Sequence, residues 1–198
     1  MNGHEFCSKY LELINNEYSG INLTRITNID EFKVKQYEDS IVPFEESSEL
    51  IADANRVIDL GFGGGFPILP LATIYREKNF IGVEARLKKV KVVGEISNRL
   101  GIDNVSFVHS RFEEFAFSDG DLILSKAMAS AYKILLGIDT QKSVKVALYK
   151  GPKFDSNEEE DVKKLHKDWQ FLLRKSYKLS DGSMRNFVVY ENVLRGTN

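Results

Sequence analysis

The sequence is poor in cysteine and proline and lacks a long apolar run. Of its 198 residues, one is cysteine, Cys7, and four are proline. A single cysteine excludes an intrachain disulfide and fits a reducing compartment. No apolar run approaches the about 20 residues that span a bilayer, and the first segment lacks the apolar core of a secretory signal. We therefore expect a cytoplasmic protein with no membrane partner.

The sequence also lacks a strong excess of either charge. Lys and Arg together number 27 and Asp and Glu 29, so the formal net charge is −2. A nucleic-acid partner would therefore have to be met by a local basic patch. The three histidines, His4, His109 and His166, are far apart and show no metal-ligand spacing, so we expect no metal. The length suits one sizeable core, and we expect a monomer, although the sequence leaves the oligomeric state open.

Helical periodicity characterises the N-terminal quarter of the chain. Apolar residues at helical spacing predict a helix over about the first 18 residues. A second helix is predicted to begin near Asn28 or Asp30, and residues 46–55 resemble a polar turn or a short helix. We interpret residues 1–55 as an N-terminal helical extension and residues 56–198 as the core, the two forming one compact unit.

From Arg56 onward, short runs rich in β-branched residues alternate with segments of helical length. The runs are residues 56–60, 79–84, 105–110, 121–127 and 144–150; the segments between them include residues 67–76, 86–100 and 128–137. This alternation predicts an α/β fold whose parallel sheet is joined by right-handed crossovers.

The C-terminal part of the sequence is predicted to contain a helix and a hairpin. Residues 155–175 predict a long charged helix with Val162, Leu165, Trp169 and Leu172 on one face. Two further runs, residues 175–180 and 186–193, flank the turn at Asp181-Gly182 and predict an antiparallel hairpin on the edge of the sheet.

A glycine-rich stretch, "VIDLGFGGGFPILPLA" at residues 57–72, lies between the first predicted strand and its helix, where nucleotide-binding loops are found. Its glycines, Gly61, Gly63 and Gly65, have the spacing G-x-G-x-G, and Phe66 stands where a dinucleotide fingerprint needs glycine. Asp59 would repel a pyrophosphate but attract the positive sulfonium and amino groups of S-adenosylmethionine. The loop therefore favours S-adenosylmethionine and disfavours a nicotinamide oxidoreductase.

A second acid supports this interpretation of the loop. Glu84 ends the second predicted strand, 19 residues beyond Gly65, where a carboxylate accepts hydrogen bonds from both hydroxyls of an adenosine ribose. The alternative is that the glycines only make a tight turn and that Glu84 is an ordinary surface acid. The combination of acid, loop, helix and second-strand acid favours the cofactor site.

Several short motifs follow one another in a specific order. They are "NLT" at 22–24, "DS" at 39–40, the glycine loop with its Phe-Pro and Pro70, "VEARLKKVKVV" at 83–93, "SRFEEF" at 110–115, "SKAMAS" at 125–130, "YKGPK" at 149–153 and "DGSMRNFVV" at 181–189. In this order they resemble the RsmG (GidB) family, methyltransferases that modify a guanine N7 in the decoding-region loop of 16S rRNA. The resemblance runs from about Tyr18 to Val193.

The resemblance implies a class I methyltransferase fold, with a Rossmann-like, mostly parallel sheet, and S-adenosyl-L-methionine as the cofactor. Its partner would be 16S rRNA or the small ribosomal subunit. The resemblance implies Gly61, Phe66, Glu84, Ala85, Arg86, Phe112, Glu113 and Lys126 as cofactor-binding residues, to which the loop itself adds Asp59, Gly63 and Gly65. It implies Asp39, Ser40 and Lys126 as substrate-binding residues. Lys35, Lys150, Lys153 and Arg185 are further substrate-binding candidates because they are positive, and the last three follow strand ends or a turn. Guanine N7 is already nucleophilic, so we assign no catalytic acid or base.

The chain departs from the family pattern at two places. The family usually has Arg at the position of Lys126, and it has Arg-His where this chain has Lys35-Gln36. Lysine keeps the charge but loses the planar fork of arginine, which suits phosphate or guanine. These departures leave open a class I methyltransferase with another substrate, or a non-catalytic module that binds S-adenosylmethionine or a nucleotide.

Overall fold

The structure, a computed structural model, describes residues 1–138, 141–152, 154 and 156–193. Its N-terminal part is helical. The elements are α1 (Gly3–Glu17), α2 (Ile29–Phe32), the π-helical η1 (Lys33–Glu38), α3 (Asp39–Glu45) and α4 (Ser48–Ala52). The predicted start of the second helix is confirmed, because the Asn28 side chain accepts hydrogen bonds from the backbone N–H groups of Asp30 and Glu31. Among the described helices, none has the length and apolar character needed to cross a bilayer.

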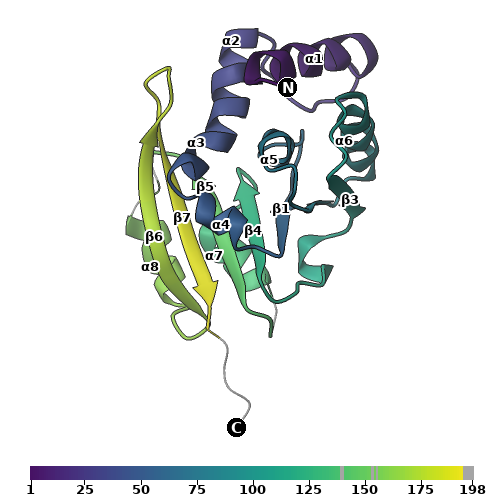
Figure 1. Cartoon of the computed structure of the whole chain (residues 1–198). Helices are drawn as coiled ribbons and strands as arrows, with labels where there is room; N and C mark the ends of the chain where they lie inside the picture. The colour runs from purple at the N-terminus through teal and green to yellow at the C-terminus, as the bar shows by residue number, and fades with distance from the viewer. Residues whose placement is uncertain (139–140, 153, 155, 194–198) are drawn as a thin grey trace.

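Seven strands form one sheet in the order β3-β2-β1-β4-β5-β7-β6 (Figure 1). They are β1 (Arg56–Leu60), β2 (Phe80–Glu84), β3 (Val105–His109), β4 (Asp121–Lys126), β5 (Val144–Lys150), β6 (Trp169–Lys178) and β7 (Met184–Asn192). The first five run parallel, whereas β7 lies antiparallel to both β5 and β6. The predicted parallel sheet and its antiparallel C-terminal hairpin are both confirmed.

Helices cover both faces of the sheet (Figure 1). The crossover elements are α5 (Ile68–Ile74), α6 (Leu87–Arg99), η2 (Phe112–Glu114), α7 (Ala131–Gly137) and α8 (Ser156–Lys163). Alternate residues of each strand point to opposite faces. Val57 therefore packs with α1, α5 and α6 in one core, and its neighbour Ile58 packs with α7 and α8 in the other. The N-terminal helices thus complete one of the two layers.

The predicted long helix over residues 155–175 is wrong in its second half. Helix α8 ends at Lys163, and the chain enters strand β6 at Trp169. The Trp169 side chain is buried, and its indole N–H donates to the carbonyl of Leu135 at 3.1 Å. Strand β6 also covers the edge of β7, whose central residues 187–190 are buried. Pairing with β7 therefore overrides a helical pattern that the local sequence supports.

Candidate functional site

The glycine loop leaves β1 at the carboxyl end of the parallel strands and enters α5. Gly61 and Gly65 have φ angles of +66° and +88°, which L side chains rarely adopt. A Cβ atom on Gly61 would also lie only 2.7 Å from the sulfur of Met128. Gly61 and Gly63 are half-buried, so the main chain of the loop reaches the surface at these two positions. The absence of side chains on these glycines and the exposure of the loop backbone both fit a ligand that lies against the backbone.

Asp59 is almost fully buried at the end of β1, with an exposed fraction of 1%. Its Oδ2 accepts a hydrogen bond from the backbone N–H of Ile68 at 3.2 Å, whereas its Oδ1 has no partner among the described residues. Burial raises the pKa of Asp59 well above its usual range, against the opposing effects of the Ile68 N–H and Lys126. A buried carboxylate oxygen without a partner fits a positively charged ligand group, as the sequence predicted for S-adenosylmethionine.

Glu84 connects the glycine loop to the turn that follows β2. Its Oε2 accepts from the Gly63 N–H at 3.3 Å, and its Oε1 accepts from the Arg86 N–H at 3.0 Å. Ala85 and Arg86 are exposed beside it, and a ring nitrogen of His109 lies 3.0 Å from the carbonyl of Ala85. The carboxylate is therefore held in place before any ligand arrives.

Phe112 and Glu113 form η2, directly after β3. The Phe112 ring is half-buried and packs against Gly137, where an added Cβ atom would lie only 2.7 Å from the ring. Glu113 is exposed. Because η2 follows the carboxyl end of β3, it lies at the same end of the sheet as Glu84. This placement is compatible with the adenine contact that the sequence predicts.

The side chain of Phe66 points into the N-terminal helical layer. Its ring centroid lies 6.2 Å from that of Phe6, 5.2 Å from Tyr10 and 5.4 Å from Phe32, each in an edge-to-face arrangement. The Tyr10 hydroxyl donates a hydrogen bond to the carbonyl of Gly64 in the loop itself. Phe66 can therefore face a ligand through its backbone, while its ring packs the loop against α1.

A second group of side chains gathers around Asp39, and we define the Asp39 cluster as Asp39, Lys126, Tyr177 and Arg185. Asp39 is buried, with an exposed fraction of 5%. Its Oδ2 lies 3.2 Å from the Lys126 ammonium; its Oδ1 lies 3.6 Å from the Arg185 Nε and accepts from the Tyr177 hydroxyl at 2.8 Å. The cluster brings together α3, β4, β6 and β7.

The other predicted substrate residues lie in different surroundings. Lys35 pairs with Asp181 in the hairpin turn, and the carbonyl of Ser40 accepts from the Tyr149 hydroxyl at 2.7 Å. Lys150 is ion-paired with Glu158 at 2.6 Å on the α8 side, and the structure does not bring it together with the Asp39 cluster. Lys153 lies outside the described residues.

Sequence reasoning missed three groups that organise this end of the molecule. Tyr177 and Tyr149 donate hydrogen bonds to Asp39 and Ser40, and Gln36 accepts from Lys126 at 3.3 Å. No sequence spacing indicates these contacts, since Gln36, Asp39 and Ser40 lie at least 90 residues from their partners in the chain. A tyrosine in a strand is ordinarily interpreted as a packing residue.

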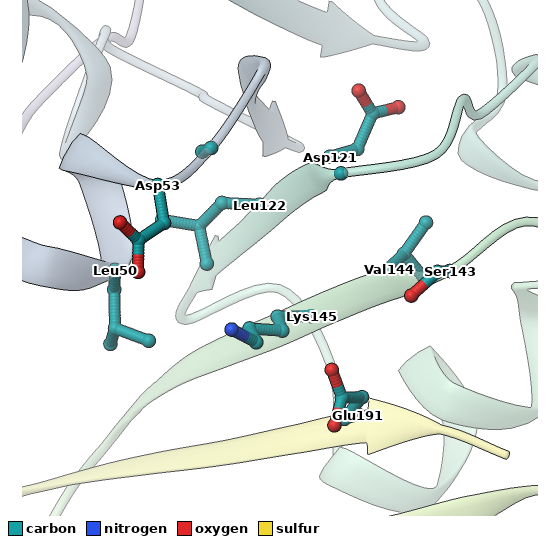
Figure 2. A pocket seen from close by; sticks show the side chains of 10 residues that line it. Leu50, Asp53, Asp121, Leu122, Ser143, Val144, Lys145 and Glu191 are labelled. Carbon is teal, nitrogen blue, oxygen red and sulfur yellow. The ribbon is translucent and has the colours of Figure 1, made fainter.

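A separate hollow of about 110 Å³ lies at the opposite end of the sheet (Figure 2). Its walls include Asp121 and Val144, the first residues of β4 and β5, together with Leu50 and Asp53. The glycine loop and the Asp39 cluster occupy the carboxyl ends of the same parallel strands. Since ligands of open α/β sheets bind at the carboxyl ends, we do not assign this hollow to the functional site.

No cluster of three or more His, Cys, Asp or Glu suited to a metal occurs among the residues described.

The sheet order and the loop between β1 and α5 define a class I methyltransferase fold. The chain is similar to magnesium protoporphyrin IX methyltransferase from Synechocystis PCC 6803 with bound SAH, at a TM-score of 0.61 and 14% identity, covering 95% of this chain and 100% of that one. It is also similar to a SAM-dependent methyltransferase from Aquifex aeolicus, at a TM-score of 0.54 and 16% identity, covering 78% and 92%. At this level of identity the likeness establishes the fold.

The family follows from the sequence comparisons. The model of the GidB family, rRNA small subunit methyltransferase G, matches residues 4–187, and the chain belongs to this family. A ribosomal RNA small subunit methyltransferase G from Clostridium novyi is 32% identical over 127 residues, which cover 62% of this chain and 51% of that protein. The one from Lactobacillus delbrueckii subsp. bulgaricus is 31% identical over 170 residues, covering 80% and 69%. The match to the Clostridium relative thus spans about half of its length.

Proposed function

We propose that the chain is an S-adenosylmethionine-dependent methyltransferase that acts on guanine N7 in the decoding-region loop of 16S rRNA. The observation that carries this proposal is the family match over residues 4–187, which includes the loop between the buried Asp59 and Glu84. The proposed partner is 16S rRNA or the small ribosomal subunit. Such a partner implies that the protein works in the cytoplasm.

The proposed cofactor site lies across the carboxyl ends of β1, β2 and β3. Asp59 Oδ1 is available for a positively charged group of S-adenosylmethionine, and the Glu84 carboxylate for the ribose hydroxyls. The main chain at Gly61, Gly63, Gly65 and Phe66 would face the methionine half, Ala85 and Arg86 would flank the ribose, and Phe112 and Glu113 would frame the adenine. Bound there, S-adenosylmethionine supplies an electrophilic methyl group.

The residues around the cofactor have a positioning task and no proton-transfer task. Guanine N7 carries a lone pair, so its methylation needs no general base. The protein has to align the base with the methyl donor and exclude water. The Asp39 cluster, Lys35 and the buried Ser40 lie on the face beside the end of β4 at which the RNA would enter.

We also propose that residues 1–55 and 56–198 act as one unit. The N-terminal helices share a core with β1 and α5, and Phe66 from the second segment packs among Phe6, Tyr10 and Phe32 from the first. The extension therefore shapes the cofactor loop as well as the substrate face. A core without residues 1–55 would expose Phe66 and its apolar neighbour Leu69 to water.

The test is methyl transfer to RNA. Purified protein, radiolabelled S-adenosylmethionine and small subunits from cells that lack the gene should yield labelled 16S rRNA, and chemical cleavage at N7-methylguanine should map the label to the decoding-region loop. The Glu84→Ala variant serves as the cofactor-site control and should transfer far less label.

Other outcomes separate the alternatives. Label on a small molecule or a protein, with none on RNA, would indicate a class I methyltransferase with another acceptor. Binding of S-adenosylmethionine by calorimetry without any transfer would indicate a non-catalytic module. Selective binding of NADH over S-adenosylmethionine would remove the cofactor assignment itself.

A further inference from the structure

The carboxylate of Asp39 holds three side chains that come from three different strands. Lys126 ends β4, Arg185 lies in β7 and Tyr177 lies in β6. The two cations have exposed side-chain fractions of 14% and 21%, and the Asp39 side chain has 7%. A carboxylate so buried, and already engaged by two cations and a hydroxyl, offers little to an incoming guanine.

The ammonium of Lys126 has three N–H donors, and three acceptors surround it. They are the Lys35 carbonyl at 3.3 Å, the Gln36 amide oxygen at 3.3 Å and the Asp39 carboxylate at 3.2 Å. All three acceptors belong to the segment that runs from η1 into α3. Lys126 therefore fastens this segment to the end of β4, and its ammonium faces these acceptors with only 14% of the side chain exposed.

Arg185 is placed differently. Its Nε faces Asp39, and its Nη1 donates to the carbonyl of Met184 at 2.9 Å. Its Nη2 has no hydrogen-bond partner among the described residues, and 21% of the side chain is exposed. An arginine held at one edge presents the other edge of its guanidinium to a planar anion such as a phosphate.

We propose that Asp39 is a positioning residue, that Arg185 is the phosphate-binding group that it positions, and that Lys126 is a tether which does not contact the RNA. This proposal rests on the proposed function, because it assigns roles within the same substrate site. With one carboxylate and two cations the Asp39 cluster carries a net charge of +1, which suits an RNA phosphate. Tyr177 remains a neutral donor, because burial and the adjacent Asp39 raise the pKa of its hydroxyl.

Contacts with the hairpin turn support the same arrangement. Glu38 accepts from the backbone N–H and from the hydroxyl of Ser180, and the Lys35 ammonium donates to the Ser183 hydroxyl at 3.1 Å. Residues on both sides of Gln36 thus bind the turn that precedes Arg185. These contacts join the segment to the hairpin that carries Arg185.

The salt dependence of RNA binding separates a phosphate contact from a tether. Kinetics with small subunits at several salt concentrations should show that Arg185→Gln raises KM at least tenfold. The same variant should lower the slope of log KM against log salt by about one unit, the change expected for the loss of one phosphate contact. Lys126→Met should leave that slope unchanged, and Arg185→Lys should recover part of the affinity. Lys167→Gln, on an exposed lysine at the far end of the hairpin, is the charge-matched control. Thermal melts identify any variant that is unfolded.

The Asp39→Asn variant should change KM in opposite directions depending on whether Asp39 positions Arg185 or only repels the RNA. Removing a negative charge near RNA would by itself tighten binding. If Asp39 positions Arg185, the variant should instead raise KM about as much as Arg185→Gln, leave the cofactor dissociation constant within twofold, and add nothing to Arg185→Gln in the double variant. A lowered KM, an additive double variant, or a slope that falls in Lys126→Met would overturn the proposal.

A measurement without RNA separates the proposed methylation of rRNA from the proposed positioning of Arg185 by Asp39. In ¹⁵N NMR spectra of the full chain, the Nε resonance of Arg185 should be shifted in Asp39→Asn, which removes the adjacent carboxylate charge, and should keep its wild-type position in Asp103→Asn. A wild type that modifies no rRNA would contradict the proposed function, yet this spectrum would still show whether Asp39 positions Arg185. An Arg185 Nε resonance that keeps its wild-type position in Asp39→Asn would overturn the positioning role on its own.

Discussion

The ammonium of Lys126 lies 3.3 Å from the amide oxygen of Gln36. At both positions the resemblance noted in the sequence leads us to expect other residues, Arg and His, and the structure places the two residues in contact with each other. A lysine ammonium is a compact charge that suits single acceptors arranged around it, whereas an arginine would present a planar fork. The contact explains how both departures fit one local arrangement.

We expect substitutions of Lys126 and Gln36 to have non-additive effects on the free energy of unfolding. Each of the variants Lys126→Met and Gln36→Leu should lower the free energy of unfolding, because each removes a partner from a partly buried hydrogen bond. The double variant should be more stable than the sum of the two losses predicts, by about 0.5–1.5 kcal/mol. Urea unfolding of the four proteins measures this difference, and strictly additive losses would show that the contact contributes nothing.

The Tyr10→Phe variant should weaken both the fold and the cofactor loop. The Tyr10 side chain is fully buried, and its hydroxyl satisfies the Gly64 carbonyl, which would be left without that donor. We expect a loss of about 1–3 kcal/mol of stability and a cofactor dissociation constant raised severalfold. Tyr18→Phe is the matched control, since its hydroxyl donates to Glu95 at the surface and should matter little. Equal effects of the two substitutions would contradict the role assigned to Tyr10.

The Glu84→Ala variant should lose cofactor affinity. The substitution removes the acceptor for the ribose hydroxyls and also frees the Gly63 and Arg86 N–H groups. We expect a loss of about 1–3 kcal/mol in binding free energy, which corresponds to about 5- to 150-fold in the dissociation constant measured by calorimetry. Glu95→Ala on the surface of α6 should leave this constant unchanged. An unchanged constant in Glu84→Ala itself would show that another group binds the ribose.

The Asp59→Asn variant should stabilise the ligand-free protein while it weakens cofactor binding. Burial raises the pKa of Asp59, so the native state retains a proton that the unfolded chain releases at lower pH. Native stability therefore falls as pH rises from the ordinary aspartate value through the raised native value, and the full loss applies above it.

Denaturant unfolding without cofactor, at several values between about pH 4 and pH 8, measures the contribution of Asp59. The stability advantage of Asp59→Asn should grow with pH and reach about 1 kcal/mol or more near neutrality. Asp103→Asn, an exposed aspartate, is the control and should show no such trend. A difference that stays constant with pH would mean that Asp59 does not titrate in this range.

Local patterns were sufficient for most of the fold. The β-branched runs and the glycine-rich turns predicted the first five strands and their crossovers, because strand and helix periodicity are properties of neighbouring residues. The same reasoning was wrong for residues 169–175, where apolar residues fit a helical face as well as a strand. There the choice depends on β7, which is distant in sequence from the start of β6 and supplies the backbone partners.

By itself the sequence determined the fold class, the family motifs and the two acids that flank the glycine loop. Those features depend only on the spacing of residues along the chain. The tertiary structure alone decided that the ring of Phe66 packs into the N-terminal layer, that Lys126 is surrounded by acceptors, and that Asp39 holds Arg185. Such contacts join residues that are far apart in the chain, and only the way the helices and strands pack brings their side chains together.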